Sequence, residues 1–225
     1  MTRLLRYTPG NIVYHVINRG VRRMRLFEND SDYRAFEEVI EETLATCNMR
    51  ICSYSLMPNH WHFVLWPEQD GDMKNFMHRL TTMHAARWQN FRNLSGVGHI
   101  YQGRYKSFPI EGDIHFYSVV RYVECNALRA NLVDRAEGWK WSSLWRRLHG
   151  NILQKQILSD WPNPEPADWI SYLNNPISME ELNLIKTCET RGRPYGSKSW
   201  TEKIAQDLNL ASSLRPLGRP YKKIL

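Results

Sequence analysis

The sequence predicts an α+β protein with a ferredoxin-like split βαβ fold, built on a four-stranded antiparallel sheet, and a C-terminal helical or irregular basic extension. Three observations support this class. Segments rich in β-branched and aromatic residues alternate with longer segments whose apolar residues recur at helical spacing. Two strand-like segments are separated only by Pro58 and Asn59, which is typical of a hairpin. The resulting order, β-α-β-β-α-β, is that of the split βαβ plan.

The first strand is predicted over residues 11–18, and the arginine-rich segment 19–25 should form a loop after it. Residues 29–31, Asn-Asp-Ser, are typical of a helix start because their side chains can accept hydrogen bonds from free backbone amides. The helix that follows is amphipathic, with these apolar residues at helical spacing: Tyr33, Phe36, Val39, Ile40 and Leu44.

The hairpin is predicted over residues 51–57 and 60–66, and a second helix over residues 73–91. The inner face of this helix should carry Phe76, Met77, Leu80, Met83 and Trp88. Both helices should cover the same face of the sheet. The other face is then left for a ligand or a further helix.

A fourth strand is predicted over residues 104–110, after a loop marked by three glycines. A third long helix should cover residues 113–131, and a short closing helix residues 139–148. We place a boundary near residue 150, because several prolines between residues 162 and 176 indicate an irregular connector. Residues 1–150 would then form one domain, and residues 151–225 a connector with a basic extension.

The predicted extension contains two short helices, at residues 178–188 and 199–209, and a repeated tetrapeptide. Gly-Arg-Pro-Tyr occurs at 192–195 and again at 218–221. With Arg191, the first copy resembles the core of an AT-hook, an extended segment whose arginines lie in an A·T-rich minor groove. A plain flexible basic tail is an equally good interpretation.

Charge indicates the class of partner. The 225 residues contain 30 Lys and Arg against 23 Asp and Glu, a formal net charge of +7. Residues 1–25 carry six arginines and no acid, and residues 186–225 carry nine bases and three acids. Clustered arginine indicates a polyanionic partner, most commonly nucleic acid, although a merely solvated basic tail is the alternative.

Composition excludes several other classes. With 42% hydrophobic and 24% charged residues, the chain is neither disordered nor fibrous. No apolar run approaches the ~20 residues that span a bilayer, and the start lacks the apolar region of a signal peptide. The four cysteines show no Cys-x-x-Cys pairing, which fits a reducing compartment. We therefore expect a cytoplasmic protein without a membrane partner.

A pair of histidines is the sharpest chemical feature. Alternation along a strand should place His60 and His62 on one face, with Trp61 and Phe63 on the other. Two imidazoles that converge in this way suit a divalent metal. A chance His-x-His pair is the alternative, because the chain has eight histidines.

The third long helix carries a second polar cluster. At 100° per residue, Tyr122, Asn126 and Arg129 fall on one stripe, and His115 extends that stripe backwards. Packed over the open sheet face, this stripe would bring a phenol, an amide and a guanidinium beside the histidines. An ordinary interfacial tyrosine with a hydrogen-bonded hydroxyl is the alternative for Tyr122.

Together these motifs resemble the single-tyrosine HUH transposases, specifically the REP-associated tyrosine transposase branch. The resemblance rests on Met-Pro-Asn-His-Trp-His-Phe-Val-Leu at 57–65 and on Tyr-x-x-x-Asn at 122–126 followed by Ala-Leu-Arg-Ala-Asn-Leu-Val. Residues 14–20 and 98–107 are also similar to that family, so the resemblance covers about residues 8–150 in the expected order.

The resemblance implies a transposase and single-strand endonuclease that uses Mg²⁺ or Mn²⁺. His60 and His62 would be metal ligands, Asn126 a third ligand, and Tyr122 the nucleophile that forms a 5′-phosphotyrosine with single-stranded or hairpin DNA. We expect the following residues to contact the DNA, with A·T-rich flanking duplex as a further contact: Arg19, Arg22, Arg23, Arg25, Arg104, Lys106, Arg129, Arg191, Arg193 and Arg219. The protein would act as a monomer or a homodimer.

Two departures from the family pattern and two alternatives accompany this interpretation. Many relatives have Asn-Pro where this chain has Asn126-Ala127, and Glu124-Cys125 replaces an apolar or aromatic pair. One alternative is a DNA-binding relative without catalytic activity. The other is a zinc hydrolase that uses His60, His62 and a third histidine such as His115.

Overall fold

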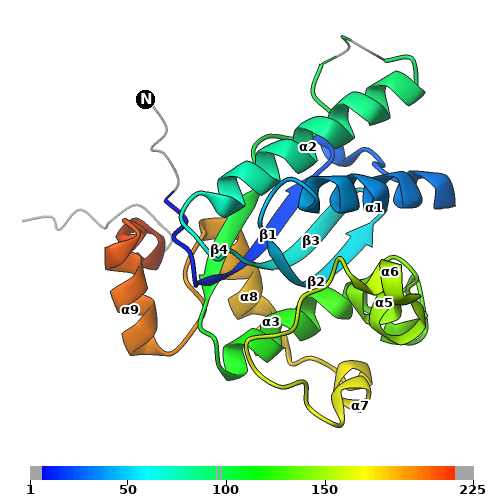
Figure 1. Ribbon diagram of the computed structural model, residues 1–225. Helices are drawn as coiled ribbons and strands as arrows, with labels where there is room; N and C mark the ends of the chain where they lie inside the picture. The colour runs from blue at the N-terminus through cyan, green and yellow to red at the C-terminus, as the bar shows by residue number, and fades with distance from the viewer. Residues whose placement is uncertain (1–6, 95, 97, 216–225) are drawn as a thin grey trace, which may run out of the picture.

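The computed structural model describes residues 7–94, 96 and 98–215, and its sheet confirms the predicted fold class (Figure 1). Four strands lie in the order β2-β3-β1-β4, and all neighbours are antiparallel. The strands are β1 (Val13–Arg19), β2 (Arg50–Met57), β3 (His60–Trp66) and β4 (Lys106–Ile110). This is the strand order of the split βαβ plan.

Helices of the described residues cover both faces of the sheet. In chain order the helical elements are η1 (Val21–Arg23), α1 (Asp30–Leu44), α2 (Asp72–Phe91), α3 (Ile114–Glu124), α4 (Asn126–Arg129), η2 (Ala136–Gly138), α5 (Ser143–His149), α6 (Ile152–Lys155), α7 (Trp169–Asn174), α8 (Met179–Arg191), α9 (Lys198–Asp207) and η3 (Ala211–Leu214). Figure 1 shows α1 and α2 on one side of the sheet and α3 on the other. Within the described ranges, no helix is both long and apolar enough to span a membrane.

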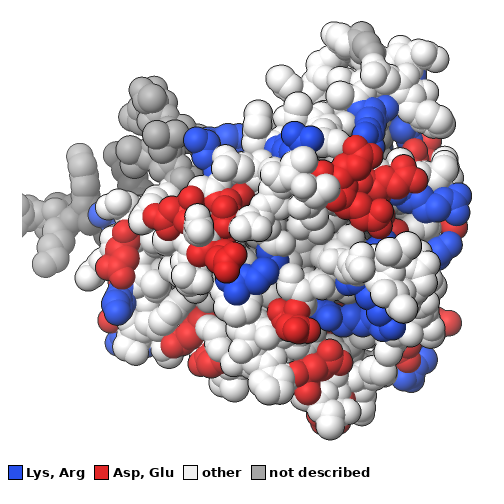
Figure 2. Space-filling view, in the orientation of Figure 1, with Lys and Arg blue, Asp and Glu red and all other residues white. Residues whose placement is uncertain are grey.

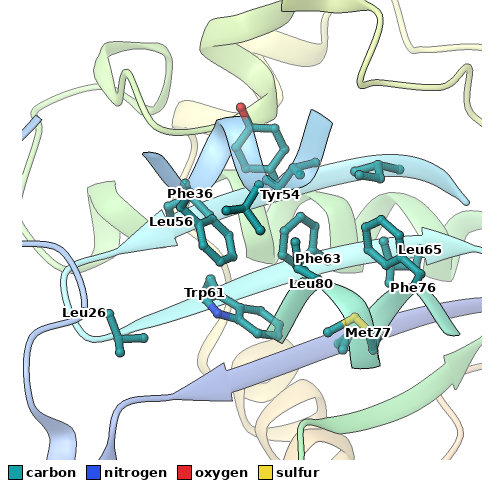
Figure 3. Packing of buried hydrophobic residues seen from close by; sticks show 14 of the residues in the cluster. Leu26, Phe36, Tyr54, Leu56, Trp61, Phe63, Leu65, Phe76, Met77 and Leu80 are labelled. Atoms are coloured by element: carbon teal, nitrogen blue, oxygen red, sulfur yellow. The ribbon is translucent and has the colours of Figure 1, made fainter. Parts of the chain in front are cut away.

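The face under α1 and α2 forms the larger hydrophobic core. Helix α1 begins where predicted, because the Asn29 side chain accepts hydrogen bonds from the amides of Ser31 and Asp32. Trp61 and Phe63 of β3 are fully buried against Phe36 and against α2, as Figure 3 shows. The alternation of β3 therefore directs its large apolar side chains to this face.

The opposite face packs against α3, with α8 beside β4, and α7 contacts α3 through Trp169. Helix α3 contacts β2, β3 and β4, and α8 contacts β4. Trp169, Leu173, Ile185 and Cys188 are buried in this second core. The division near residue 150 stays a prediction, but residues from both sides of that point share this core.

Two of the predicted helices have different bounds. The helix predicted over 113–131 is broken at Cys125, whose ψ of 7° is not helical and whose Sγ lies 3.0 Å from the carbonyl oxygen of Leu173. The helix predicted from residue 139 begins at Ser143 instead, because the Ser142 side chain caps it by accepting a hydrogen bond from the amide of Trp145. Local apolar spacing predicted the helices but not these caps and breaks.

The first Gly-Arg-Pro-Tyr copy is part of the folded structure rather than an extended arm. Gly192, with φ 67°, ends α8 in the left-handed conformation. The amide of Tyr195 then donates to the carbonyl of Pro109, and the Tyr195 carbonyl accepts from Glu111, both at 2.9 Å. The AT-hook interpretation is therefore wrong for this copy. The second copy lies outside the described residues.

A buried histidine in the larger core predicts a pH-dependent stability. Burial lowers the pKa of His84 to about 3. Between pH 6.5 and this value the unfolded chain binds more protons than the folded one, so stability present above pH 6.5 is lost as the pH falls. His84→Phe should flatten this loss by up to about 1.4 kcal/mol per pH unit. Urea unfolding of both proteins at several pH values tests this, and identical pH profiles would contradict it.

Candidate catalytic site

His60 and His62 lie together on the face of the sheet that α3 covers. Their ring centroids are 5.0 Å apart. His62 is buried, and His60 is half-buried at the start of β3 beside Arg19 of β1, its partner in the strand register. The strand period of two thus separates the imidazoles from Trp61 and Phe63, as the sequence predicted.

The hydrogen bonds of both rings use Nδ1 and leave Nε2 available. His60 Nδ1 lies 2.6 Å from Asn59 Oδ1, and His62 Nδ1 lies 2.8 Å from Nε2 of His15 on β1. Burial, followed by the nearby arginine Arg19, lowers the pKa of His60 to about 4. Burial also holds the pKa of His62 well below its ordinary value. Both rings are therefore neutral near pH 7, the form in which imidazole binds metal.

Tyr122 of α3 lies beside His62. Its ring centroid lies 5.8 Å from that of His62, and its hydroxyl donates a 3.2 Å hydrogen bond to Oε2 of Glu189 on α8. Burial and then the Glu189 carboxylate raise the pKa of the Tyr122 phenol, whereas Arg129 and Arg19 lower it. The phenol is thus held protonated at neutral pH.

Arg129 contacts Tyr122 through its ring and its backbone carbonyl. Its guanidinium carbon lies 4.0 Å from the Tyr122 ring centroid, and Nη1 donates to the Tyr122 carbonyl at 2.7 Å. Asn126 Oδ1 accepts from Arg129 Nη2 at 3.0 Å. The Asn126 amide nitrogen is buried and has no partner among the described residues. The stripe predicted from helical spacing therefore holds together despite the break at Cys125.

Glu189 and His15 are members of the site that the sequence did not indicate. A possible metal-binding group consists of His15, His62 and Glu189, whose ligand atoms all lie within 4.8 Å of one another. Burial raises the pKa of Glu189, opposed by the Tyr122 hydrogen bond and by Arg19, Lys106 and Arg129. The β1–β3 register could have pointed to His15, but no local motif marks Glu189.

The predicted basic residues divide into three groups. Arg19, Lys106 and Arg129 lie close enough to lower the pKa of Glu189 and so belong to the site. Arg22 and Arg23 adopt left-handed φ values of 50° and 61°, in an exposed loop whose Arg23 carbonyl accepts from the side chain of Asn59. Strain of this kind clusters at functional sites.

The third group is spread over the rest of the molecule. Arg25 and Arg104 are exposed, Arg193 is half-buried, and Arg191 donates to the carbonyl of Ser212 at 3.3 Å. Arg219 lies outside the described residues. Figure 2 shows acidic and basic side chains interspersed on the face viewed, so that face offers no continuous basic patch.

A hollow of about 790 Å³ lies between α2 and the loop that precedes β4. Arg104 and Lys74 contribute its positive charge, and no acidic residue is among its described lining residues. The loop is joined to β1, since the Gln102 amide donates to the Arg19 carbonyl at 2.9 Å and the Asn18 side chain donates to the Gly103 carbonyl at 3.3 Å. The hollow runs along α2 from Lys74 to Gln89, and Asn18, next to Arg19 of the histidine site, is among its lining residues.

His115 does not join His60 and His62. Its Nδ1 lies 2.7 Å from a carboxylate oxygen of Asp113, and its possible metal-binding group is formed with Glu111 and Asp113. The three-histidine zinc site considered from the sequence is therefore not formed. The four cysteines are free, and three of them are buried.

Comparison with known proteins gives one family match. The model of IS200-like transposases matches residues 9–126, more than half of the chain. A comparison with curated proteins gives no match.

The solved structures that are similar to the chain include two transposases. A REP-associated tyrosine transposase bound to a REP hairpin is 19% identical, with a TM-score of 0.54 over 74% of this chain and 98% of that one. A candidate transposase of Deinococcus radiodurans is 15% identical, with a TM-score of 0.40 over 55% of this chain and 93% of that one. At these identities, the first likeness supports the fold.

Proposed function

The chain belongs to the family of IS200-like transposases, and from this premise we propose that it cleaves and rejoins single-stranded or hairpin DNA through a 5′-phosphotyrosine formed by Tyr122. The observation that carries this proposal is the position of Tyr122, whose hydroxyl is hydrogen-bonded to Glu189 and whose ring lies beside that of the neutral His62. The similar transposase bound to a REP hairpin supports hairpin DNA as the substrate class.

The donor atoms of the site fit a divalent metal. Nε2 of His60 and Nε2 of His62 are available, and Glu189 adds a carboxylate oxygen within 4.8 Å of a His62 ring nitrogen. Mn²⁺ accepts such a mixed nitrogen and oxygen set more readily than Mg²⁺, which prefers oxygen ligands. When bound, either ion would polarise the scissile phosphate and offset the charge that develops on it. Asn126 remains a candidate for a further oxygen ligand.

The protein groups around Tyr122 suit a nucleophilic attack. We propose that the Tyr122 oxygen attacks the phosphorus in line, while the phenolic proton passes to Glu189. A bond forms between phosphorus and the tyrosine oxygen, the bond to the DNA 3′-oxygen breaks, and that oxygen leaves as a hydroxyl after it takes a proton from solvent. Glu189 Oε2, which already accepts the hydrogen bond of the Tyr122 hydroxyl at 3.2 Å, is positioned to take this proton. A second 3′-hydroxyl can then reverse the step and rejoin the strands.

We propose that the basic groups around the site and in the hollow beside α2 bind the DNA strand. Arg19, Lys106 and Arg129 would contact the phosphates next to the scissile bond, since they surround Glu189 electrostatically. The exposed Arg22, Arg23 and Arg25 would hold the flanking strand on one side. On the other side, Arg104 and Lys74 in the hollow beside α2 would hold it.

The experiment that tests the function is a search for covalent adducts. The full chain would be incubated with labelled hairpin and single-stranded DNAs in the presence of Mn²⁺. We expect a protein–DNA adduct that survives denaturation, together with a DNA fragment ending in a free 3′-hydroxyl. Tight DNA binding with no adduct for any substrate would favour the alternative of a DNA-binding relative without catalytic activity.

The C-terminal tail is expected to strengthen DNA binding outside the site. Deleting residues 216–225 tests this expectation. A longer deletion that begins after Ile185 is unsuitable, because it would also remove the buried Cys188 and part of α8. These residues contain Arg219, Lys222 and Lys223 and no acid. Each lost phosphate contact lowers the slope of log affinity against log salt by about 0.7–0.9, so the deletion should flatten the slope by up to about 2–3.

Hairpin binding at several salt concentrations measures this slope. Replacing the same three basic residues with glutamine in the full-length chain separates charge from chain length. An unchanged slope in both variants would show that the tail does not touch DNA.

A further inference from the structure

His15 contacts His62 and is fully buried in β1. Its Nε2 lies 2.8 Å from His62 Nδ1, and its ring packs against that of Phe108 with centroids 4.8 Å apart. Its second nitrogen, Nδ1, has no hydrogen-bond partner among the described residues. A half-satisfied buried imidazole is costly, because the buried nitrogen has lost its hydrogen bonds to water and gained none in the fold.

The 2.8 Å contact allows two arrangements of the protons of the two neutral rings, because one of the facing nitrogens must donate and the other must accept. In the first, His62 Nδ1–H donates to His15 Nε2, and the lone pair of His62 Nε2 is free. In the second, His15 Nε2–H donates to His62 Nδ1, and His62 Nε2 carries a hydrogen. A cation can bind only the first arrangement, because a protonated ring nitrogen has no lone pair to offer.

We propose that His15 is a positioning residue that accepts the Nδ1–H of His62 and so holds His62 in the tautomer whose Nε2 can bind a divalent metal. The inference rests on the proposed metal site. It gives this site the outer hydrogen-bond partner that a metal-binding histidine ordinarily has. Asn59 Oδ1, 2.6 Å from His60 Nδ1, serves the first histidine in the same way.

Packing alone does not require a histidine at this position. The His15 ring contacts Phe108 and lies in an apolar layer with Val64 and Val13, where a phenylalanine would bury no unpaired nitrogen. A role as a direct metal ligand also fits less well. The two nitrogens face each other with the spacing and direction of a hydrogen bond, whereas two ligands of one ion direct their lone pairs at a third point.

Two substitutions distinguish the effect of the His15 Nε2 acceptor from the effect of the shape of the ring. His15→Phe keeps the ring shape and removes the acceptor, whereas His15→Gln places an amide oxygen near the position of Nε2. Electron paramagnetic resonance measures the affinity of the full-length chain for Mn²⁺ in the absence of DNA. This affinity should fall about 10–100-fold in His15→Phe. In His15→Gln the dissociation constant should stay within about threefold of the wild-type value.

His84→Phe is the matched control. His84 is also fully buried and neutral, and its Nδ1 lies 2.6 Å from the Tyr101 hydroxyl, but it belongs to the opposite core. This variant should bind Mn²⁺ as the wild type does. Thermal unfolding of the metal-free proteins should show His15→Phe to be no less stable than His84→Phe, which separates a loss of metal binding from a loss of fold.

Nitrogen chemical shifts of the metal-free wild type give a second readout that needs no variant. We expect His62 to be protonated at Nδ1, and His15→Phe to lose that preference. The inference is overturned if wild-type His62 is protonated at Nε2, if His15→Phe binds Mn²⁺ as tightly as the wild type, or if His15→Gln is as weak as His15→Phe. If the wild type itself binds no Mn²⁺, the proposed metal-dependent function fails together with the inference.

Discussion

Tyr122→Phe is expected to abolish the covalent protein–DNA adduct and to leave DNA affinity nearly unchanged. The substitution deletes only the attacking oxygen. The ring still contacts His62 and remains under the Arg129 guanidinium, so the local packing survives. Removing a nucleophile lowers turnover by on the order of 10⁴-fold or more. Denaturing gels of labelled hairpin DNA measure the adduct, and binding under the same conditions measures affinity.

Tyr117→Phe provides the matched control for this prediction. Tyr117 lies on the same helix, but its hydroxyl donates to the carbonyl of Pro164 at 2.7 Å and is directed away from the histidines. The control should form the adduct at the wild-type rate. If Tyr122→Phe also forms it, another residue is the nucleophile and the assignment of Tyr122 is wrong.

His60→Ala and His62→Ala are expected to abolish metal-dependent cleavage. Each removes one proposed nitrogen ligand, and the loss of several kcal/mol of transition-state stabilisation corresponds to about 10²–10³-fold or more in rate. Asn126→Ala should reduce cleavage less, because water can replace a single amide oxygen around Mg²⁺. Cleavage measured against Mn²⁺ concentration in each variant tests this order.

The two histidine variants differ in their effect on the fold. His60 is half-buried at the start of β3, whereas His62→Ala also leaves the buried His15 without its partner. His60→Ala is therefore the cleaner test. His115→Ala, in a separate cluster with Asp113, should cleave normally. Full activity of the wild type after complete chelation of metal would rule out the metal site altogether.

The sequence predicted the parts of the molecule that follow from local periodicity. The strand period of two placed His60 and His62 on one face, and the helical period placed Tyr122 beside Arg129. The element order predicted the split βαβ plan, and the strand order of the sheet confirms that plan. The roles of these residues in catalysis stay predictions.

Contacts between distant segments could not be predicted from one sequence. Glu189 reaches Tyr122 from a helix 67 positions later, and His15 reaches His62 only through the β1–β3 register. The break at Cys125 and the docking of Tyr195 beside β4 likewise depend on tertiary contacts. Neither propensity nor motif spacing carries information on such pairs.

The alternation along β3 has a consequence for insertions and deletions. Trp61 and Phe63 fill one core while His60 and His62 line the opposite face. The phase of the alternation along β3 therefore decides which face of the sheet each side chain occupies. Losing one residue from the turn at Pro58 and Asn59 would invert that phase if β3 slipped by one place. The imidazoles would then enter the apolar layer under α1 and α2. A change in turn length should therefore yield a chain that misfolds and aggregates, rather than a folded transposase that lacks activity.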